Sequence, residues 1–293
     1  MESHDFAWAA GFFDGEGWAN RSSRGVQSRI NQAGLDGVPE VLTKFQGIVG
    51  VGRIHGPVVV DGRQPLYYWE ATSRPDLVQV VDRIGPWLCP VKRAEFERTL
   101  GRPVPAQIWP GSMSEELAWA GGFFDAEGST YLEKHRSHRG YFASRLHVTQ
   151  SHSGGVAPEL LRFKSAMGDI GTISGASKDK RDDKPYTRWR AFAENEVQLG
   201  FHLLMPFIGH VKRQQALAVI GVINSQAQLL RGNPAFGTAG TRYCLRGHDK
   251  WNARLRPFKG RGKNEVDPMN HLRQCLTCVR DDARARRIKK RRP

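Results

Sequence analysis

Small and large apolar residues recur with helical spacing in two segments of the chain, residues 3–17 and 114–128. In each segment alanine, glycine and one aspartate fall at i, i+3, i+4 and i+7, so they form one narrow helix face beside larger aromatic residues. A face of alanine and glycine lets two helix backbones approach closely. The pattern predicts two helices that pack together through Ala7, Ala10, Gly11 and Asp14 and through Ala118, Gly121, Gly122 and Asp125.

Short polar residues and glycines mark the expected ends of both helices. Ser3 and Ser114 are suited to the N-cap position, because a serine hydroxyl can accept a bond from a free backbone amide. Gly17 and Gly128 favour the opposite ends. We expect the large aromatic residues of the first helix to pack into the core of its own half; these are Phe6, Trp8, Phe12 and Phe13.

The two helical segments are copies of one another, since ten of their fifteen aligned positions are identical. Later features recur in the same order: a glutamine, a glycine-containing turn, an aromatic strand and a lysine that follows an apolar stretch. A repeat of this length predicts two copies of one structural unit. We therefore expect a first half over 1–107, a linker over 108–111, a second half over 112–233 and a tail over 234–293.

Strand patterns follow each helix. In the segment 143–150, Arg145, His147 and Thr149 alternate with Leu146 and Val148, as expected of a sheet with one buried face and one open face. The resulting prediction is an α+β chain with two such sheets.

Charge changes the picture at the end of the chain. The net charge is +15, and residues 242–293 alone hold 17 Lys/Arg against 5 Asp/Glu. A strong positive charge favours a polyanion such as nucleic acid, although a solvated basic tail without a partner is the alternative. No apolar run is long enough to cross a bilayer and no signal peptide is apparent, so we expect a cytoplasmic protein, encoded by a bacterium or phage.

Each copy of the repeat ends in an acidic pair, and the second acid is Glu16 or Glu127. If the two helices pack side by side, these carboxylates lie together and repel unless they share divalent cations. Mg²⁺ with a phosphate oxygen and water would suit phosphodiester hydrolysis. For Asp14 and Asp125, on the packing faces, we favour a structural role in capping backbone groups.

The segments AAGFFDGEG and AGGFFDAEG resemble the two motifs of a single-chain LAGLIDADG homing endonuclease. The resemblance implies a duplicated αββαββα unit with a saddle of two antiparallel sheets over DNA. It implies that Glu16 and Glu127 hold the metal ions. It also implies that a glutamine at a strand end and a lysine before the last helix surround each scissile phosphate, namely Gln32, Gln150, Lys92 and Lys212. Lys92 aligns with Lys212 only after a one-residue shift.

Polar residues of the strands and loops form a candidate DNA-reading surface, because arginine and lysine pair with guanine edges and glutamine with adenine. Individually, each is as well explained by a phosphate contact or a solvated charge. The surface comprises Arg21, Arg24, Gln27, Arg29, Arg53, Arg63, Arg145, His147, Lys178, Arg188 and Arg190.

The tail contains three of the four cysteines. Cys244, His248, Cys275 and Cys278 together form a four-ligand set suited to tetrahedral Zn²⁺. Three reduced thiols without a metal are the alternative. Cys89, which follows an apolar stretch, we interpret as a buried structural thiol.

The leading hypothesis is a monomeric, Mg²⁺-dependent endonuclease that cuts double-stranded DNA at a long, imperfectly palindromic site, with a structural zinc module that adds DNA affinity. A noncatalytic DNA-binding regulator is one alternative on the same fold. An RNA maturase, whose partner is intron RNA, is the other.

Overall fold

The computed structural model describes residues 2–23, 25–134, 142–152, 154–178, 185–232, 256–257 and 271–272. The chain divides into two compact units, Met1–Ile220 and Gly221–Pro293. In the second unit the short strands β9 (Arg256–Pro257) and β10 (His271–Leu272) pair antiparallel. Within the described segments no helix has the length and apolar character needed to cross a membrane.

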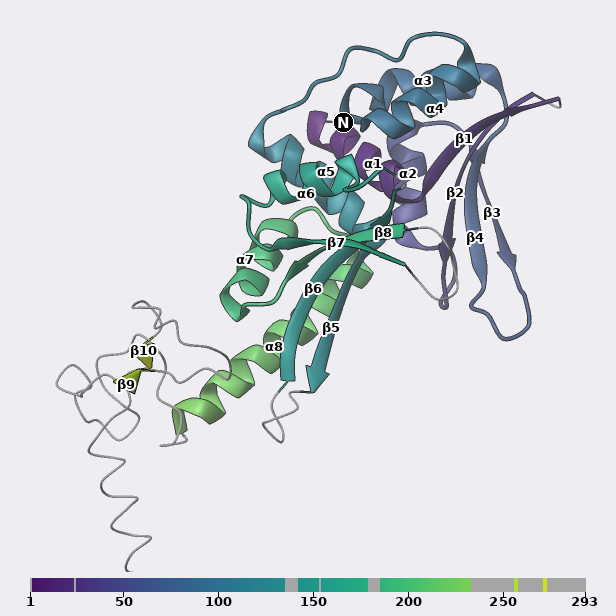
Figure 1. Cartoon of the computed structure of the whole chain (residues 1–293). Coiled ribbons are helices and arrows are strands. Elements are labelled where there is room, and N and C mark those ends of the chain that lie inside the picture. The colour runs from purple at the N-terminus through teal and green to yellow at the C-terminus, as the bar shows by residue number, and fades with distance from the viewer. Residues whose placement is uncertain are drawn as a thin grey trace, which may run out of the picture. The chain divides into compact units, whose positions relative to one another are not determined.

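The first unit contains two halves with the same order of elements (Figure 1). The first half consists of α1 (Ser3–Glu16), β1 (Gly17–Ser22), β2 (Gly25–Ala33), α2 (Glu40–Val49), β3 (Arg53–Val58), β4 (Leu66–Ala71), α3 (Arg74–Ile84), a 3-10 turn η1 (Gly85–Trp87) and α4 (Pro90–Leu100).

The second half repeats this order. It consists of α5 (Met113–Glu127), β5 (Gly128–Lys134), β6 (Phe142–Ser151), α6 (Pro158–Ala166), β7 (Thr172–Lys178), β8 (Pro185–Ala191), α7 (Glu194–Leu204) and the start of α8 (His210–Gly232), a helix that continues past Ile220 into the second unit. Each half thus ends in two helices, one more than the expected αββαββα unit. The helical conformation is interrupted around Pro86 and Pro206, and a new helix begins after each interruption.

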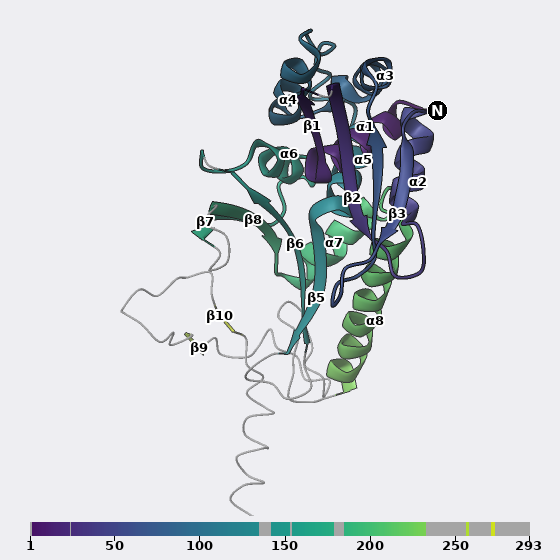
Figure 2. The same ribbon diagram turned by 90° about the vertical axis from the view of Figure 1, so that its right-hand side faces the viewer.

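Each half forms one four-stranded antiparallel sheet, with strand orders β1-β2-β4-β3 and β5-β6-β8-β7. One face of each sheet is buried under helices and the other is open, as the alternating pattern predicted. In the first sheet, Ile30 lies opposite both Gly17 and Trp69, and all three are buried. In Figure 2 the strand β2 of the first sheet crosses the level of α1, and β5 of the second sheet runs downward from the end of α5.

The helices α1 and α5 pack against each other at very short range. A Cβ atom added to Gly11 would lie 1.9 Å from the Trp119 carbonyl oxygen, and one added to Gly122 would lie 1.9 Å from that of Trp8. Only glycine fits at this crossing, because any side chain would overlap the neighbouring backbone. The predicted packing is therefore present at Gly11 and Gly122, whereas Gly121 of the predicted face packs against Phe207.

The helix caps differ from those expected. The N-cap residue of α1 is Glu2, and that of α5 is Ser112, so Ser3 and Ser114 lie inside their helices. Ser112 forms a capping box: its Oγ accepts a bond from the Glu115 amide at 3.3 Å, and Glu115 Oε2 accepts one from the Ser112 amide at 2.8 Å. Gly17 and Gly128 do end the helices, and each begins a strand directly in extended backbone.

Candidate active site

Glu16 and Glu127 are the last residues of α1 and α5, and the close packing of the two helices brings these ends together. A Cβ atom added to Gly15 would lie 2.4 Å from Ala126 Cβ and 3.0 Å from Glu127 Cγ. Both glutamates are only partly exposed. The twin helix ends therefore place two carboxylates beside each other at the centre of the first unit.

Burial raises the pKa of both carboxylates, and the charge of Glu16 raises that of Glu127 further. The pKa of Glu127 is raised to about 8, first by burial and then by the charge of Glu16, against the attraction of Lys212 and Lys92. Burial also raises the pKa of Glu16, while Lys212 lowers it. A positive ion between the two carboxylates would relieve both the burial cost and the repulsion.

A divalent cation fits this carboxylate pair only with help from other ligands. Among the residues that the structure describes, no three His, Cys, Asp or Glu side chains form a metal-binding group. Hard cations such as Mg²⁺ commonly use one or two carboxylates and complete their shell with water and substrate phosphate. The donor set of Glu16 and Glu127 has this character.

The two predicted lysines lie in the first turn of the last helix of each half, in α4 and α8, and not ahead of it. Lys212 interacts with both Glu16 and Glu127, and its ammonium donates a hydrogen bond to the Gly128 carbonyl oxygen. Burial lowers the pKa of Lys212, against the attraction of Asp125 and the two glutamates. Lys92 interacts with Glu127 and is also bound by a carboxylate of its own helix.

The partner of Lys92 is Glu95, whose carboxylate oxygens lie 3.2 and 3.4 Å from the ammonium. Glu95 is itself tied to β1, because its Oε2 accepts a bond from the Ala19 amide at 3.4 Å. The corresponding position beside Lys212 is the exposed Gln215. The two lysines therefore occupy equivalent places with different neighbours, a difference that the repeat did not predict.

Gln32 and Gln150 lie near the ends of β2 and β6. Gln32 is two residues past Ile30, which faces the first residue after α1, so it lies in the part of β2 that runs alongside the end of α1. Both side chains are half-buried and share the helix-covered face of their sheets, opposite Tyr67 and Thr187. Their role beside the glutamates stays a prediction.

Asp14 is fully buried and accepts hydrogen bonds from two different parts of the chain. Its oxygens accept bonds from the Cys89 amide at 3.1 and 3.0 Å, at the start of α4, and from Trp119 Nε1 of the other half at 2.8 Å. Burial raises the pKa of Asp14 to about 7, against the effect of the Trp119 bond. Cys89 is a buried thiol, as predicted.

Asp125 repeats this arrangement in the opposite direction. It accepts bonds from the Gly209 amide at 2.9 and 2.8 Å and from Trp8 Nε1 at 3.1 Å. Burial raises its pKa to about 6, against the Gly209 and Trp8 bonds. The expected capping role of the two aspartates is thus present, but Trp8 reaches beyond the core of its own half. The tryptophan repeated in both motifs was the sequence signal for this crossing.

Two cationic side chains outside the motif helices also join the halves: Arg162, which is buried, and Lys44, which is half-buried. Arg162 of α6 stacks 4.3 Å over the Trp119 ring, donates a bond to the Trp87 carbonyl of the first half, and pairs with Glu116 at 2.9 Å. Lys44 of α2 makes equivalent contacts: its ammonium lies 3.7 Å over the Trp8 ring of its own half and donates a bond to the Phe207 carbonyl of the other half at 3.4 Å. Sequence reasoning missed both, because the two residues differ in type and carry no motif.

The open faces of the sheets carry most of the predicted DNA-reading residues. Residues directly opposite in antiparallel strands share a face, which places the following side chains on the open faces: Gln27, Arg29 and Arg53 in the first sheet and Arg145, His147, Arg188 and Arg190 in the second. Burial, followed by the charges of Arg188 and Arg190, lowers the pKa of His147 to about 4. The imidazole is therefore neutral at pH 7.

Other predicted residues lie elsewhere. Arg21 is opposite Val26 and so points away from Gln27, and Arg63 lies in the turn between β3 and β4. Lys178 is the last residue of β7. Arg24 and the four proposed zinc ligands Cys244, His248, Cys275 and Cys278 lie outside the described residues.

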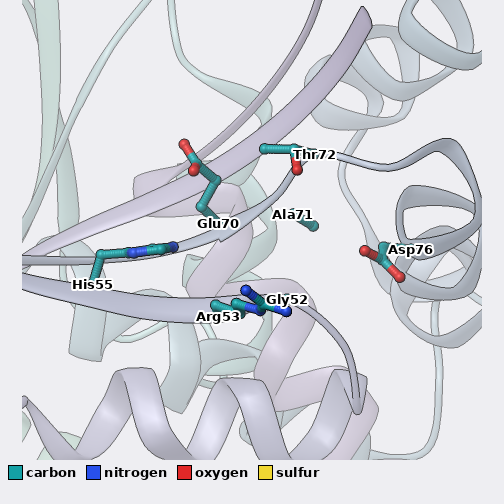
Figure 3. Close-up of a pocket in the computed structure, with 7 residues that line it drawn as sticks. All are labelled: Gly52, Arg53, His55, Glu70, Ala71, Thr72 and Asp76. Atoms are coloured by element: carbon teal, nitrogen blue, oxygen red, sulfur yellow. The ribbon is translucent and has the colours of Figure 1, made fainter.

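A hollow of about 410 Å³ lies at the outer end of the first sheet, between the strands β3 and β4 and the start of α3 (Figure 3). Its polar lining comes from Arg53, His55, Glu70, Thr72 and Asp76. Arg53 lies opposite Glu70 in the register of β3 and β4. Sequence reasoning selected Arg53 but missed Glu70.

Comparison with known proteins identifies the fold. No protein-family model and no curated protein sequence matches the chain. Solved structures with a similar fold include the LAGLIDADG meganuclease I-AabMI bound to uncleaved DNA, with a TM-score of 0.57 and 14% identity over 77% of this chain and 92% of that chain.

Two further structures agree. The LAGLIDADG homing endonuclease I-GzeII in complex with its DNA target has a TM-score of 0.55 and 15% identity over 76% of this chain and 92% of that chain. The LAGLIDADG meganuclease I-CpaMI bound to uncleaved DNA has a TM-score of 0.52 and 13% identity over 75% of this chain and 92% of that chain. The chain therefore has the duplicated α+β fold of the LAGLIDADG homing endonucleases.

Proposed function

We propose that this chain is a monomeric, site-specific endonuclease that cuts double-stranded DNA with the help of Mg²⁺. The observation that carries the proposal is the pair of half-buried carboxylates, Glu16 and Glu127, at adjoining helix ends with Lys212 interacting with both. Structural neighbours whose fold is shared were solved bound to DNA, which supports the class of substrate.

Each residue type has a definite task in such a site. Glu16 and Glu127 would hold the metal ions, which when bound supply an activated water and neutralise phosphate charge. The Lys212 ammonium would stabilise the charge that develops on the phosphate as the bond to the leaving oxygen breaks. Gln32 and Gln150 would orient the attacking water. Lys92 would act on the second strand as Lys212 acts on the first.

The open sheet faces would supply DNA recognition. Their arginines can contact phosphates or donate to guanine edges, and Gln27 can pair with adenine. Because the two faces carry different side chains, the target would be long and only imperfectly palindromic. One chain provides both halves, so a second copy is unnecessary.

The proposal is tested by incubating the protein with linear and supercoiled DNA libraries and Mg²⁺, followed by sequencing of the ends produced. We expect discrete cuts that disappear in the Glu16→Gln and Glu127→Gln variants, while both variants still retain the same DNA. Glu194→Gln, which changes an exposed residue at the start of α7 outside the motif helices, is the matched control and should cut normally.

Two other outcomes would reject the nuclease. Tight, sequence-specific retention of DNA without cuts by the wild-type protein would indicate a DNA-binding regulator. Rescue of intron splicing without DNA cleavage would indicate a maturase.

For the tail we propose a structural Zn²⁺ module formed by Cys244, His248, Cys275 and Cys278, which adds DNA affinity through the surrounding basic residues. Metal analysis of the purified protein should give about one zinc per chain, and less for Cys275→Ser. A metal-free wild-type protein would contradict the module without affecting the nuclease proposal.

A further inference from the structure

Equivalent rows of side chains cross the open faces of the two sheets. In the first sheet Arg29 lies opposite Glu70, and Glu70 lies opposite Arg53. In the second sheet the same row holds His147, Arg190 and Thr172. At one position, therefore, the first half presents a carboxylate where the second half presents a guanidinium.

Glu70 organises the donors around it. Its Oε1 accepts a hydrogen bond from Gln27 Nε2, and the same oxygen lies 3.6 Å from Arg29 Nε. The Arg29 guanidinium stacks 3.5 Å over the Tyr68 ring, which fixes its plane. An acidic side chain on a surface that binds DNA is unfavourable unless it contacts a donor of the ligand, because it repels phosphate.

Glu70 can be reached from outside the protein. It lines the rim of the hollow of about 410 Å³, and Figure 3 shows its carboxylate extending from β4 away from Arg53 and Asp76. The carboxylate is thus oriented by its neighbours and still borders open space.

The second half has Arg190, and no carboxylate, at the position that Glu70 occupies in the first half. No acidic side chain in the described part of the chain forms an ion pair with Arg188 or Arg190, whereas Arg145 pairs with Glu133 at 3.1 Å. Arg190 lies with its guanidinium 5.8 Å from the Phe192 ring, and Arg188 donates a bond to Thr149 Oγ1 at 2.8 Å. Arg190 therefore keeps donors available to an acceptor on DNA.

We propose that Glu70 is a specificity-determining residue that makes the two half-sites of the DNA target differ. This inference rests on the proposed function. In the major groove an ionised carboxylate accepts a hydrogen bond from the N4 amine of cytosine, while arginine donates to O6 and N7 of guanine. Glu70 selects cytosine in the first half-site, and Arg190 selects guanine at the position related to it by the pseudo-two-fold axis.

The test uses the full-length protein and its mapped target, with every base pair varied singly. Binding is measured by competition in EDTA, and cleavage is measured separately with Mg²⁺. We expect Glu70→Gln to reduce the preference for cytosine about tenfold at one base pair of the first half-site only. Glu70→Arg should shift that preference to guanine. Arg190→Gln is the matched control and should alter one base pair of the other half-site.

Unchanged base preferences in Glu70→Gln would overturn the inference, and so would a loss spread evenly over both half-sites. A circular dichroism melt of each variant verifies its fold, and Glu70→Asp, which keeps the charge, should retain a preference for cytosine. A wild-type protein that neither binds nor cuts a defined DNA site would instead contradict the proposed function itself. A protein that cuts its site with preferences independent of Glu70 leaves the nuclease proposal intact and rejects only this inference.

Discussion

Lys92 and Lys212 show how much one neighbouring residue can change a repeated position of the candidate site. Lys212 interacts with both motif glutamates, whereas Lys92 interacts with Glu127 and is also held by Glu95 at 3.2 Å. Since Glu95 is anchored to the Ala19 amide, Lys92 cannot turn toward a phosphate without breaking an ion pair. On a DNA substrate, Lys212 would contact the phosphate of one strand without leaving such an ion pair, whereas Lys92 would first have to leave its ion pair with Glu95.

The Glu95→Gln variant should speed cleavage of one strand. We expect about a fivefold increase in the rate at the site served by Lys92, equivalent to an ion pair of about 1 kcal/mol, with little change at the other site. Strand-specific end labels on a supercoiled target report both rates. Gln215→Glu, the reciprocal change, should slow the other strand. Equal effects on both strands in either variant would contradict this account.

Cation binding by Glu16 and Glu127 should depend on pH. The pKa of Glu127 is raised to about 8, so below that pH the folded protein holds a proton that a cation must displace. Affinity for Mg²⁺ should therefore increase from pH 6.5 to 8.5, and binding should release protons at pH 7. Calorimetry in buffers of different ionisation enthalpy measures both quantities. A Glu127→Gln variant that kept the same pH dependence would show that another group is responsible.

At the scale of residues, the repeated motif singled out the acidic residues but did not reveal the hydrogen-bond partners of Asp14. Glu16 and Glu127 could be selected because the repeat shows the same acid twice beside a face of small residues. The bonds to Asp14 could not, because Cys89 and Trp119 are far from it in the chain and only the folded structure brings them together. Glu70 was missed because an acid on a basic surface reads as an ordinary solvated charge.

The helix crossing gives a prediction at the scale of elements. Gly11→Ala would place a methyl group 1.9 Å from the Trp119 carbonyl oxygen, which only backbone movement can relieve. We expect the free energy of unfolding to fall by about 3 kcal/mol or more. Chemical denaturation followed by tryptophan fluorescence measures this change.

Gly47 provides the control for that substitution. It lies within α2, and a Cβ atom added there would meet no other atom within 4 Å. Gly47→Ala should therefore stabilise the protein by about 0.5–1 kcal/mol through helix propensity alone. If Gly11→Ala were as harmless as Gly47→Ala, the close packing of α1 and α5 would be wrong.

Element order was predictable because periodicity survives in the sequence, but element boundaries were less so. The alternation of Arg145, Leu146 and His147 correctly gave a sheet with one open face. The start of α5 was displaced from Ser114 to Ser112 because Ser112 and Glu115 complete a capping box, which competes with a lone serine. The extra helix in each half arises because the helical conformation is interrupted there, and hydrophobic periodicity does not reveal this interruption.

The buried aspartates give the whole molecule a pH-dependent stability. The pKa values of Asp14 and Asp125 in the folded protein are about 7 and about 6, above the value of 3.8 for a free side chain. Because the folded state holds these protons more tightly, their contribution to stability is complete below about pH 4 and is lost as the pH rises through 6 and 7.

Thermal melts in EDTA should therefore give a lower Tm at pH 7.5 than at pH 5. Asp125→Asn, which cannot ionise, should flatten this dependence by at most about 3 kcal/mol. Glu194→Gln, which changes an exposed side chain, should leave the slope as in the wild-type protein. A slope that persists unchanged in Asp125→Asn would assign the effect to other acids.

The crossed bonds between the halves also limit what each half must contribute to the other. The packing of α1 against α5 requires a glycine such as Gly122, an indole such as Trp119 and a carboxylate such as Asp125. None of these residues belongs to an open sheet face. The side chains of the open sheet faces can therefore change independently while this joint between the halves stays constant. Chimaeras of two chains with this fold should therefore fold if they keep the glycine crossing, the crossed indole–carboxylate bonds and the contacts of Arg162 and Lys44 across this joint, and each half should carry its own sheet face with it.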